Sequence, residues 1–289
     1  MILGTVVGSV SALSRFAFNL PVGAQRASRD AILRLWEEGS FAEAHRAALE
    51  ALASRPMDYF LLTMRGFSAY QVGVAQANRQ IAAVFFEDSI KALRRAMLLP
   101  EAETDGRLFY VLGKAYFYMG EDFADLTIRY LEQARALGHP ASDIPEFLGL
   151  AYASIGDYRS SVIAFAEALE VTRPSELLLF HIAESYVGLG ELYKARAYLM
   201  RSISVSMDSR VTIRARLFLS DVLRMLEDFD GASAQLMSIM EETGENAEAR
   251  FRLGELHSQR GDVVRARAEW RLALNIDPAH LGARARLAL

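Results

Sequence analysis

The stretch from Phe147 to Pro174 reads FLGLAYASIGDYRSSVIAFAEALEVTRP, and its small and large residues alternate in a definite order. Leu148 and Tyr152 lie four residues apart, on one face of a helix, before Gly156–Asp157 interrupts the pattern. Glycine ends a helix at little cost, and aspartate can cap the helix that follows. The stretch therefore predicts two helices joined by a tight turn.

The same order occurs at three other places in the chain. These are 111–123 (VLGKAYFYMGEDF), 181–202 (HIAESYVGLGELYKARAYLMRS) and 252–278 (RLGELHSQRGDVVRARAEWRLALNIDP). Small residues let helix backbones approach, so we expect Ala168 and Ala273 to be buried where the two helices of a unit cross. A pattern that recurs over most of a chain predicts a repeat protein.

The order resembles the tetratricopeptide repeat, which reads W-x2-L-G-x2-Y, then A-x3-F, then P, over about 34 residues. The resemblance covers residues 25–280 and implies an all-α, right-handed α-solenoid of helix-turn-helix repeats. Seven units begin near Gln25, Tyr59, Gly106, Ser142, Glu176, Ile213 and Ala247.

Three details of the repeat array lead to further expectations. The sixth unit is degenerate. The second unit carries an insert after Tyr70, which should lengthen its two helices or form a protruding loop. Residues 281–289 should form a C-terminal capping helix, with Leu281, Ala285 and Ala288 on one side.

The composition is that of an ordered chain, with 52% hydrophobic and 24% charged residues. The net charge of −4 gives no basic field for binding nucleic acid. The chain has no cysteine, which excludes disulfides, cysteine-ligated zinc and cysteine nucleophiles. The lack of cysteine is consistent with a cytosolic protein, and somewhat more so with an exported one.

The first 24 residues differ from the rest, because residues 2–13 are apolar and Arg15 is the first charged side chain. One interpretation is a secretory signal or membrane anchor, with membrane contact through residues 1–20 and a membrane-anchored or periplasmic location. The other is a helix docked on the N-terminal end of the repeats, where a terminal repeat exposes an apolar face. Both interpretations remain open, with anchoring or export slightly favoured over a cytoplasmic location.

No pattern typical of an enzyme is present. The five histidines are scattered, and neither a Gly-rich phosphate loop nor a G-x-S-x-G elbow occurs. We therefore expect no catalytic residues, no metal site and no cofactor.

In proteins of this family the first helix of each repeat lines the concave face. Once the packing positions are assigned, one stripe of residues is left on these helices, aromatic in the N-terminal half and charged in the C-terminal half. The predicted partner-binding groove comprises Phe60, Phe67, Tyr70, Tyr110, Lys114, Phe117, Phe147, Phe180, Glu184 and Asp221. The alternative is that these aromatic rings pack between adjacent first helices.

Some family members hold a partner's terminal carboxylate with lysines and asparagines on these helices. Here the stripe offers Arg29, Arg107 and Lys114 without matching asparagines. An extended or helical apolar segment suits the groove better. The resemblance thus implies a non-enzymatic scaffold that binds a protein partner. The alternative is a structural subunit or homo-oligomer that makes contact through its end faces.

Overall fold

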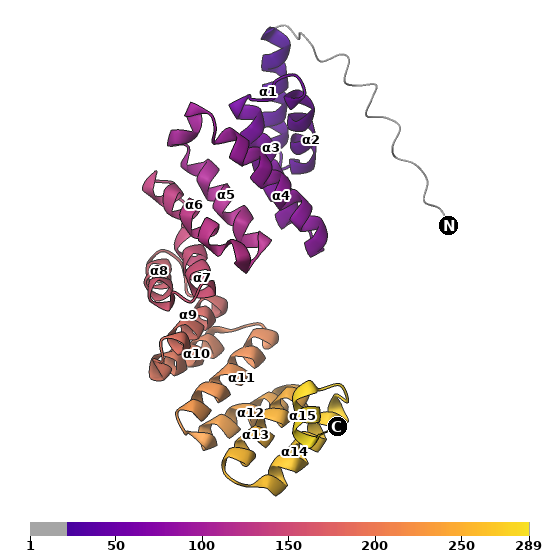
Figure 1. Ribbon diagram of the computed structural model, residues 1–289, viewed down its shortest axis with the longest axis vertical. Coiled ribbons are helices and arrows are strands. Elements are labelled where there is room, and N and C mark those ends of the chain that lie inside the picture. Colours follow the sequence, from indigo (N-terminus) through magenta and orange to yellow (C-terminus); the bar gives the residue numbers. More distant parts are fainter. Residues whose placement is uncertain (1–21, 289) are drawn as a thin grey trace, which may run out of the picture. The chain divides into compact units, whose positions relative to one another are not determined.

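The computed structural model describes residues 22–288, with side chains described from residue 29 onward. Within this part the chain forms α-helices joined by short turns, with no strand (Figure 1). The consecutive packed helices confirm the predicted all-α helical-repeat fold. The prediction for residues 1–24 falls almost wholly on residues outside this part.

The chain divides into two compact units, Met1–Ile155 and Gly156–Leu289, which we call unit 1 and unit 2. The helices of unit 1 are α1 (Val22–Glu37), α2 (Phe41–Leu52), α3 (Tyr59–Val74), α4 (Arg79–Ala96), η1 (Pro100–Thr104), α5 (Gly106–Met119), η2 (Glu121–Phe123), α6 (Ala124–Ala136) and α7 (Ile144–Ser154). Those of unit 2 are α8 (Tyr158–Val171), α9 (Glu176–Gly188), α10 (Leu192–Val205), α11 (Ser209–Met225), α12 (Phe229–Thr243), α13 (Ala247–Gln259), α14 (Val263–Ile276) and α15 (Leu281–Leu287).

The insert after Tyr70 lengthens both helices of the second repeat, which was one of its two predicted outcomes. Helix α3 has 16 residues and α4 has 18. Asn78 caps α4, because its side chain accepts hydrogen bonds from the backbone N–H groups of Gln80 and Ile81. The extra sequence is therefore absorbed as helix.

Small residues occupy the helix crossings, as the repeat order predicts. A Cβ atom added to Gly66 would lie 2.5 Å from Leu93, and one added to Gly254 would lie 2.4 Å from Trp270. Ala168 and Ala273 are fully buried, which confirms their predicted positions. A larger side chain at these places would push the paired helices apart.

Several turns inside the repeats use a left-handed glycine, and after Gly156 and Gly261 the next residue is an aspartate that caps the second helix. Gly156 has φ +77°, and the Asp157 carboxylate accepts a hydrogen bond from the Ser160 N–H at 3.1 Å. The degenerate sixth repeat departs from this rule, because Glu227 takes the left-handed position with φ +61°. A residue with a Cβ is strained in this conformation.

The C-terminal helix packs with a different face from the one predicted. Ala283 is buried and Leu287 is half-buried against the cluster of Ala266, Trp270 and Ala273. Leu281 is 83% exposed, and Ala285 and Ala288 are exposed as well, so the predicted packing side was wrong. The reason is the phase of the helix: His280 caps it by accepting from the Ala283 N–H, which turns positions 283 and 287 inward.

None of the helices in the described part of the chain is long and apolar enough to cross a lipid bilayer.

Candidate functional site

Unit 1 contains a cleft of about 330 Å³ with mostly aromatic walls, which we call the aromatic cleft. Helices α3 and α5 supply most of it, through side chains spaced three or four residues apart on one face of each helix. Its lining residues are Trp36, Phe67, Tyr70, Gln71, Val74, Arg107, Tyr110, Val111, Lys114, Tyr118 and His139.

One end of the aromatic cleft is a stack of rings beneath an arginine. The Trp36 and Phe67 ring centroids are 6.4 Å apart. The Arg107 guanidinium lies 4.5 Å from the Phe67 centroid and 5.1 Å from the Trp36 centroid. Its side chain makes no hydrogen bond or ion pair with the described residues, so its N–H groups are free while the rings hold the plane in place.

A closed polar set lies deeper in the same cleft. The Lys114 ammonium is buried, 2.7 Å from the Asp143 carboxylate and 3.1 Å from the Tyr110 hydroxyl. The Tyr110 hydroxyl donates to Asp143 at 3.0 Å. Burial, reinforced by the Asp143 carboxylate, holds the pKa of Tyr110 well above its usual range, so this donor stays protonated. The charge of Lys114 is therefore already matched.

His139 adds no positive charge to the cleft near neutral pH. Its ring packs at a tilt against that of Tyr110, with the ring centroids 4.8 Å apart. Burial, aided by the charge of Arg107, lowers the pKa of His139 below its ordinary value. Arg107 is therefore the one cation lining this cleft, among the described residues, whose charge is unmatched.

The outer lip of the cleft is apolar and accessible. Val74 is 46% exposed and Tyr118 is 43% exposed. Tyr118 stacks on Phe86 with ring centroids 5.0 Å apart, and it contacts Tyr70 at 6.1 Å. A bound apolar chain could cover this lip without moving the rings behind it.

In unit 2 the corresponding helix faces carry ion pairs. Three acidic residues, each directly after the small crossing residue of a first helix, pair with an arginine of the next first helix. The pairs, which we call the acid–arginine ladder, are Glu184–Arg214 at 3.4 Å, Asp221–Arg252, and Glu255–Arg286 at 2.6 Å.

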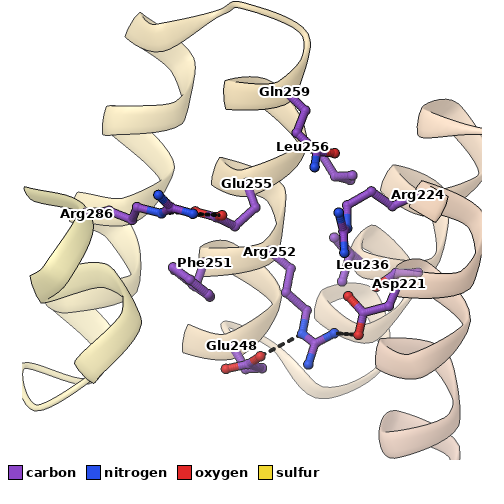
Figure 2. Close-up of a pocket in the computed structure, with 11 residues that line it drawn as sticks. Asp221, Arg224, Leu236, Glu248, Phe251, Arg252, Glu255, Leu256, Gln259 and Arg286 are labelled. Carbon is purple, nitrogen blue, oxygen red and sulfur yellow. Dashed lines mark hydrogen bonds and ion pairs between the residues drawn. The ribbon is translucent and has the colours of Figure 1, made fainter. Parts of the chain in front are cut away.

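The ladder borders a second cleft of about 440 Å³, which we call the polar cleft (Figure 2). Helices α11, α13 and α15 supply most of its lining, and α12 adds Leu236. The lining residues are Ser220, Asp221, Arg224, Leu236, Glu248, Phe251, Arg252, Glu255, Leu256, Gln259 and Arg286.

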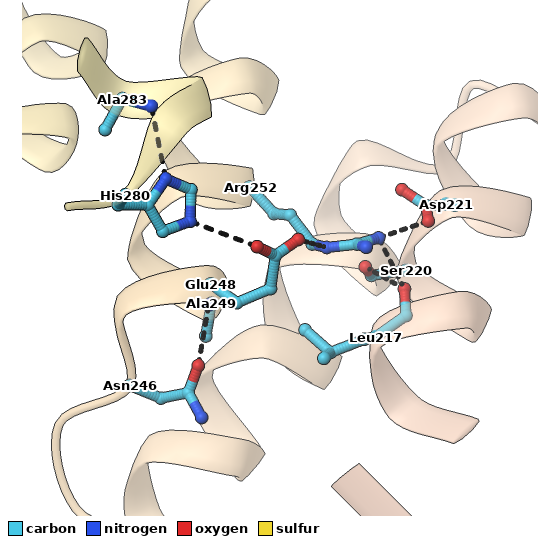
Figure 3. Close-up of polar contacts among 9 residues, drawn as sticks. All are labelled: Leu217, Ser220, Asp221, Asn246, Glu248, Ala249, Arg252, His280 and Ala283. Carbon is cyan, nitrogen blue, oxygen red and sulfur yellow. Dashed lines mark hydrogen bonds and ion pairs between the residues drawn. The ribbon is translucent and has the colours of Figure 1, made fainter. Parts of the chain in front are cut away.

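Arg252 is the centre of this cleft (Figure 3). Its guanidinium pairs with Asp221, donates to Glu248 at 2.6 Å and reaches the Leu217 carbonyl at 3.2 Å. Burial alone would lower the pKa of Arg252, but the two carboxylates outweigh it and raise the pKa. His280 extends the network, because its Nε2 lies 3.1 Å from the second Glu248 oxygen. These contacts tie α15 to α13 and fix one wall of the cleft.

A tetratricopeptide-repeat family model matches residues 178–206, which span most of α9 and α10. That match is one repeat of an array that the structure continues on both sides. The described part of the chain is a helical repeat with the fold of tetratricopeptide-repeat proteins. No curated protein matches the chain along its sequence.

Solved structures of tetratricopeptide-repeat proteins share the fold. The C-terminal part of one from Cytophaga hutchinsonii is 16% identical with a TM-score of 0.61, covering 90% of this chain and 100% of that one. One from Parabacteroides merdae is 15% identical with a TM-score of 0.54, covering 91% and 98%. YrrB, described as a TPR protein with an unusual peptide-binding site, is 18% identical with a TM-score of 0.54, covering 69% and 100%. At these identities the likeness concerns the fold.

The residues predicted for the groove fall into three groups. Three of the rings are buried between helices, as the alternative interpretation held: Phe67, Tyr70 and Phe180. Lys114 is also buried. Half-buried are Phe60, Tyr110, Phe117, Phe147, Glu184 and Asp221. A partner could reach only this last group directly, and their role in binding stays a prediction.

Several half-buried rings are already engaged. Phe60 lies under the Arg29 guanidinium at 5.3 Å, and Arg29 itself pairs with Asp58 at 2.7 Å. Phe117 and Phe147 meet edge to face with centroids 4.9 Å apart. These contacts tie successive first helices together.

Sequence reasoning missed five charged residues of the polar cleft: Arg224, Glu248, Arg252, Glu255 and Arg286. A signal for three of them was present. Acid and arginine recur 30 or 31 residues apart along the ladder, close to one repeat length. That spacing brings them onto neighbouring first helices.

Proposed function

We propose that this protein is a non-enzymatic interaction scaffold that binds a partner polypeptide in the aromatic cleft of unit 1. The observation that carries the proposal is that one cleft is lined both by the accessible lip of Val74 and Tyr118 and by the unmatched guanidinium of Arg107. Exposed aromatic and apolar surface of this kind is typical of partner sites. The fold it shares with YrrB, a TPR protein with a peptide-binding site, gives further support.

The lining favours an extended apolar segment as the ligand. The walls offer ring faces and two valine side chains, and the Arg107 N–H groups can donate to a carbonyl or carboxylate oxygen of the partner. A pair of free cations for a chain-terminal carboxylate is missing from this stripe, since Asp58 matches Arg29 and Asp143 matches Lys114. Apolar contact should therefore supply most of the affinity.

Site-specific crosslinking tests the proposal. A photo-reactive benzoylphenylalanine is placed at Val74, at the lip of the cleft, or at Val264, which is 81% exposed on α14 and lies outside both clefts. Irradiation in the source cell should give a discrete crosslinked polypeptide from position 74 that is missing from position 264. Crosslinks of equal intensity from both positions, or none from position 74, would contradict the proposal.

A second function, assembly through the end faces, is favoured by one observation. Leu281 on the last helix is 83% exposed, although leucine usually packs inside a fold. Size-exclusion chromatography with light scattering separates the two functions. A stable oligomer that Leu281→Ser converts to a monomer supports assembly, and a monomer at all concentrations opposes it.

Membrane association through residues 1–20 is a separate proposal, motivated by their apolar sequence. If the segment is an anchor or a cleaved signal, the native protein fractionates with membranes or the periplasm, and mass analysis of a cleaved form finds a start near Gln25. Intact Met1 in a soluble fraction would favour the docked helix.

A further inference from the structure

The charges lining the polar cleft of unit 2 do not balance in pairs. Three carboxylates and three guanidinium groups line it. Asp221 and Glu248 both pair with Arg252, and Glu255 pairs with Arg286. Arg224 is left, and it makes no side-chain hydrogen bond or ion pair with any residue in the described part of the chain. The six charges sum to zero, but Arg224 is the one guanidinium of the cleft that lacks an acceptor among the described residues.

The position of Arg224 suits a receptor for a ligand. It lies in the last turn of α11 and is half-buried. Figure 2 shows its guanidinium inside the cleft, between Asp221 on one side and Gln259 on the other. A guanidinium removed from part of its water and left without hydrogen-bond acceptors is unfavourable, and an incoming anion would relieve this cost.

The rest of the lining indicates what kind of anion fits. Leu236, Phe251 and Leu256 provide apolar wall, and Gln259 provides an exposed amide beside Arg224. Arg224 alone lacks an acceptor in the described part of the chain, so it can take one carboxylate, whereas a dianion would add a further negative charge next to the ladder carboxylates. This set matches a carboxylate at the end of a short aliphatic stem.

We infer that the polar cleft is a second binding site, which takes an acidic side chain of a partner polypeptide with Arg224 as its carboxylate receptor. The inference rests on the proposed function only in that the ligand is a polypeptide. It concerns residues of unit 2 alone. The wall formed by Arg286 and α15 makes the C-terminal helix part of this site as well as a cap.

Peptide selection followed by matched binding measurements tests the inference. A displayed library of random dodecapeptides is selected on the full chain, and the strongest binders are remade as fluorescein peptides with each Glu or Asp kept or changed to the amide. Fluorescence anisotropy then compares wild type, Arg224→Gln and Arg267→Gln. Arg267 is an exposed arginine of α14 that lies outside both clefts, and it provides the matched control.

We expect one class of selected peptides to bind wild type about tenfold or more tightly in the acidic form than in the amide form. Arg224→Gln should remove that difference, and Arg267→Gln should keep it. Arg224→Lys keeps the charge but loses the planar fork, so it should leave a reduced difference. Arg224→Lys also replaces Arg224→Gln as the test variant if Arg224→Gln fails to fold.

Selected peptides without acidic preference would overturn the inference, as would a preference that survives Arg224→Gln. A preference lost instead in Arg107→Gln would place the acid in the aromatic cleft, overturning the inference while the proposed function stands. A library that yields no binder overturns both.

Discussion

The two units differ at one position of the repeat, the residue directly after the small crossing residue of each first helix. In unit 1 this residue is Phe67, Lys114 or Leu150, and in unit 2 it is Glu184, Asp221 or Glu255. An arginine of the next first helix reaches it in most cases. Arg107 lies over the Phe67 ring, whereas Arg214, Arg252 and Arg286 pair with the three acids.

This difference shows how one scaffold builds two kinds of cleft. The backbone and the crossings are alike in both units, because Gly66 and Gly254 serve the same steric purpose. Changing the next residue from a ring to a carboxylate turns a cation–π contact into an ion pair. The cleft then becomes polar without any change of fold. The comparison predicts that unit 1 depends on packing and unit 2 on charge.

Removing a ring from the aromatic cleft should have the largest effect. Phe67 is 5% exposed, so Phe67→Ala leaves a cavity and should lower the free energy of unfolding of unit 1 by about 3 kcal/mol. The chain has one tryptophan in each unit, Trp36 and Trp270. Urea denaturation followed by Trp36 fluorescence, in a Trp270→Phe background, reports on unit 1.

The control for this variant is Tyr193→Ala, which removes a ring that is 70% exposed on α10. It should change the stability of unit 2 by less than about 0.5 kcal/mol. A loss below about 1 kcal/mol for Phe67→Ala would place that ring at the surface. The aromatic stripe would then be an open groove, as the sequence first suggested.

Removing the central charge of each cleft is the second test. Arg252→Met leaves Asp221 without its arginine and leaves Glu248 with only His280, so it should destabilise unit 2 by about 2–3 kcal/mol, a value reduced because these groups are partly exposed. Lys114→Met leaves only Asp143, which the Tyr110 hydroxyl still contacts, and should cost unit 1 about 1–2 kcal/mol. Urea denaturation followed by each unit's own tryptophan measures both. The comparison fails if Lys114→Met is the more costly change.

The sequence predicts the scaffold better than the clefts, for a physical reason. Crossing residues such as Ala168 and turn residues such as Gly156 depend on local geometry that recurs in every repeat, so the repeat order reveals them. Whether Phe67 or Phe180 is covered depends on how the first helix of the neighbouring repeat is rotated about its axis. The pairing of Arg252 with two acids depends on such a rotation as well. Predicting C-terminal packing failed likewise, because capping by His280 set the phase of α15.

Unit 1 also contains an ion network, so it depends partly on charge, and the pH dependence of its stability can test this. Asp88 contacts His45 Nε2 at 2.8 Å and Arg65 Nε at 2.9 Å. Burial alone would raise the pKa of Asp88, but the hydrogen bonds and charges of His45 and Arg65 outweigh it and lower the pKa to about 2. Because the folded pKa is below the ordinary value of 3.8, this carboxylate stabilises unit 1 above about pH 4.

That contribution is lost as the pH falls through about 2. Asp88→Asn should therefore lower the stability of unit 1 by about 2 kcal/mol near pH 6. The gap between variant and wild type should narrow as the pH falls from 4 toward 2. Urea denaturation at several pH values, followed by Trp36, measures the gap. A constant gap over this range would mean that the carboxylate charge contributes nothing.

The smallest effect concerns the turn of the degenerate repeat, where unit 2 departs from the rule that unit 1 follows with Gly39 at φ +74°. Glu227 is exposed at φ +61°, and a residue with a side chain is strained by about 1–2 kcal/mol in this conformation. Glycine removes the strain, but its greater freedom in the unfolded chain cancels part of the gain in stability. Glu227→Gly should therefore stabilise unit 2 by about 0.5–1 kcal/mol. Gly190→Ala, at φ +74° in another turn of unit 2, should cost about 1 kcal/mol. Urea denaturation followed by Trp270 fluorescence in a Trp36→Phe background measures both, and a loss of stability in Glu227→Gly would show that the Glu227 side chain outweighs the strain of its backbone.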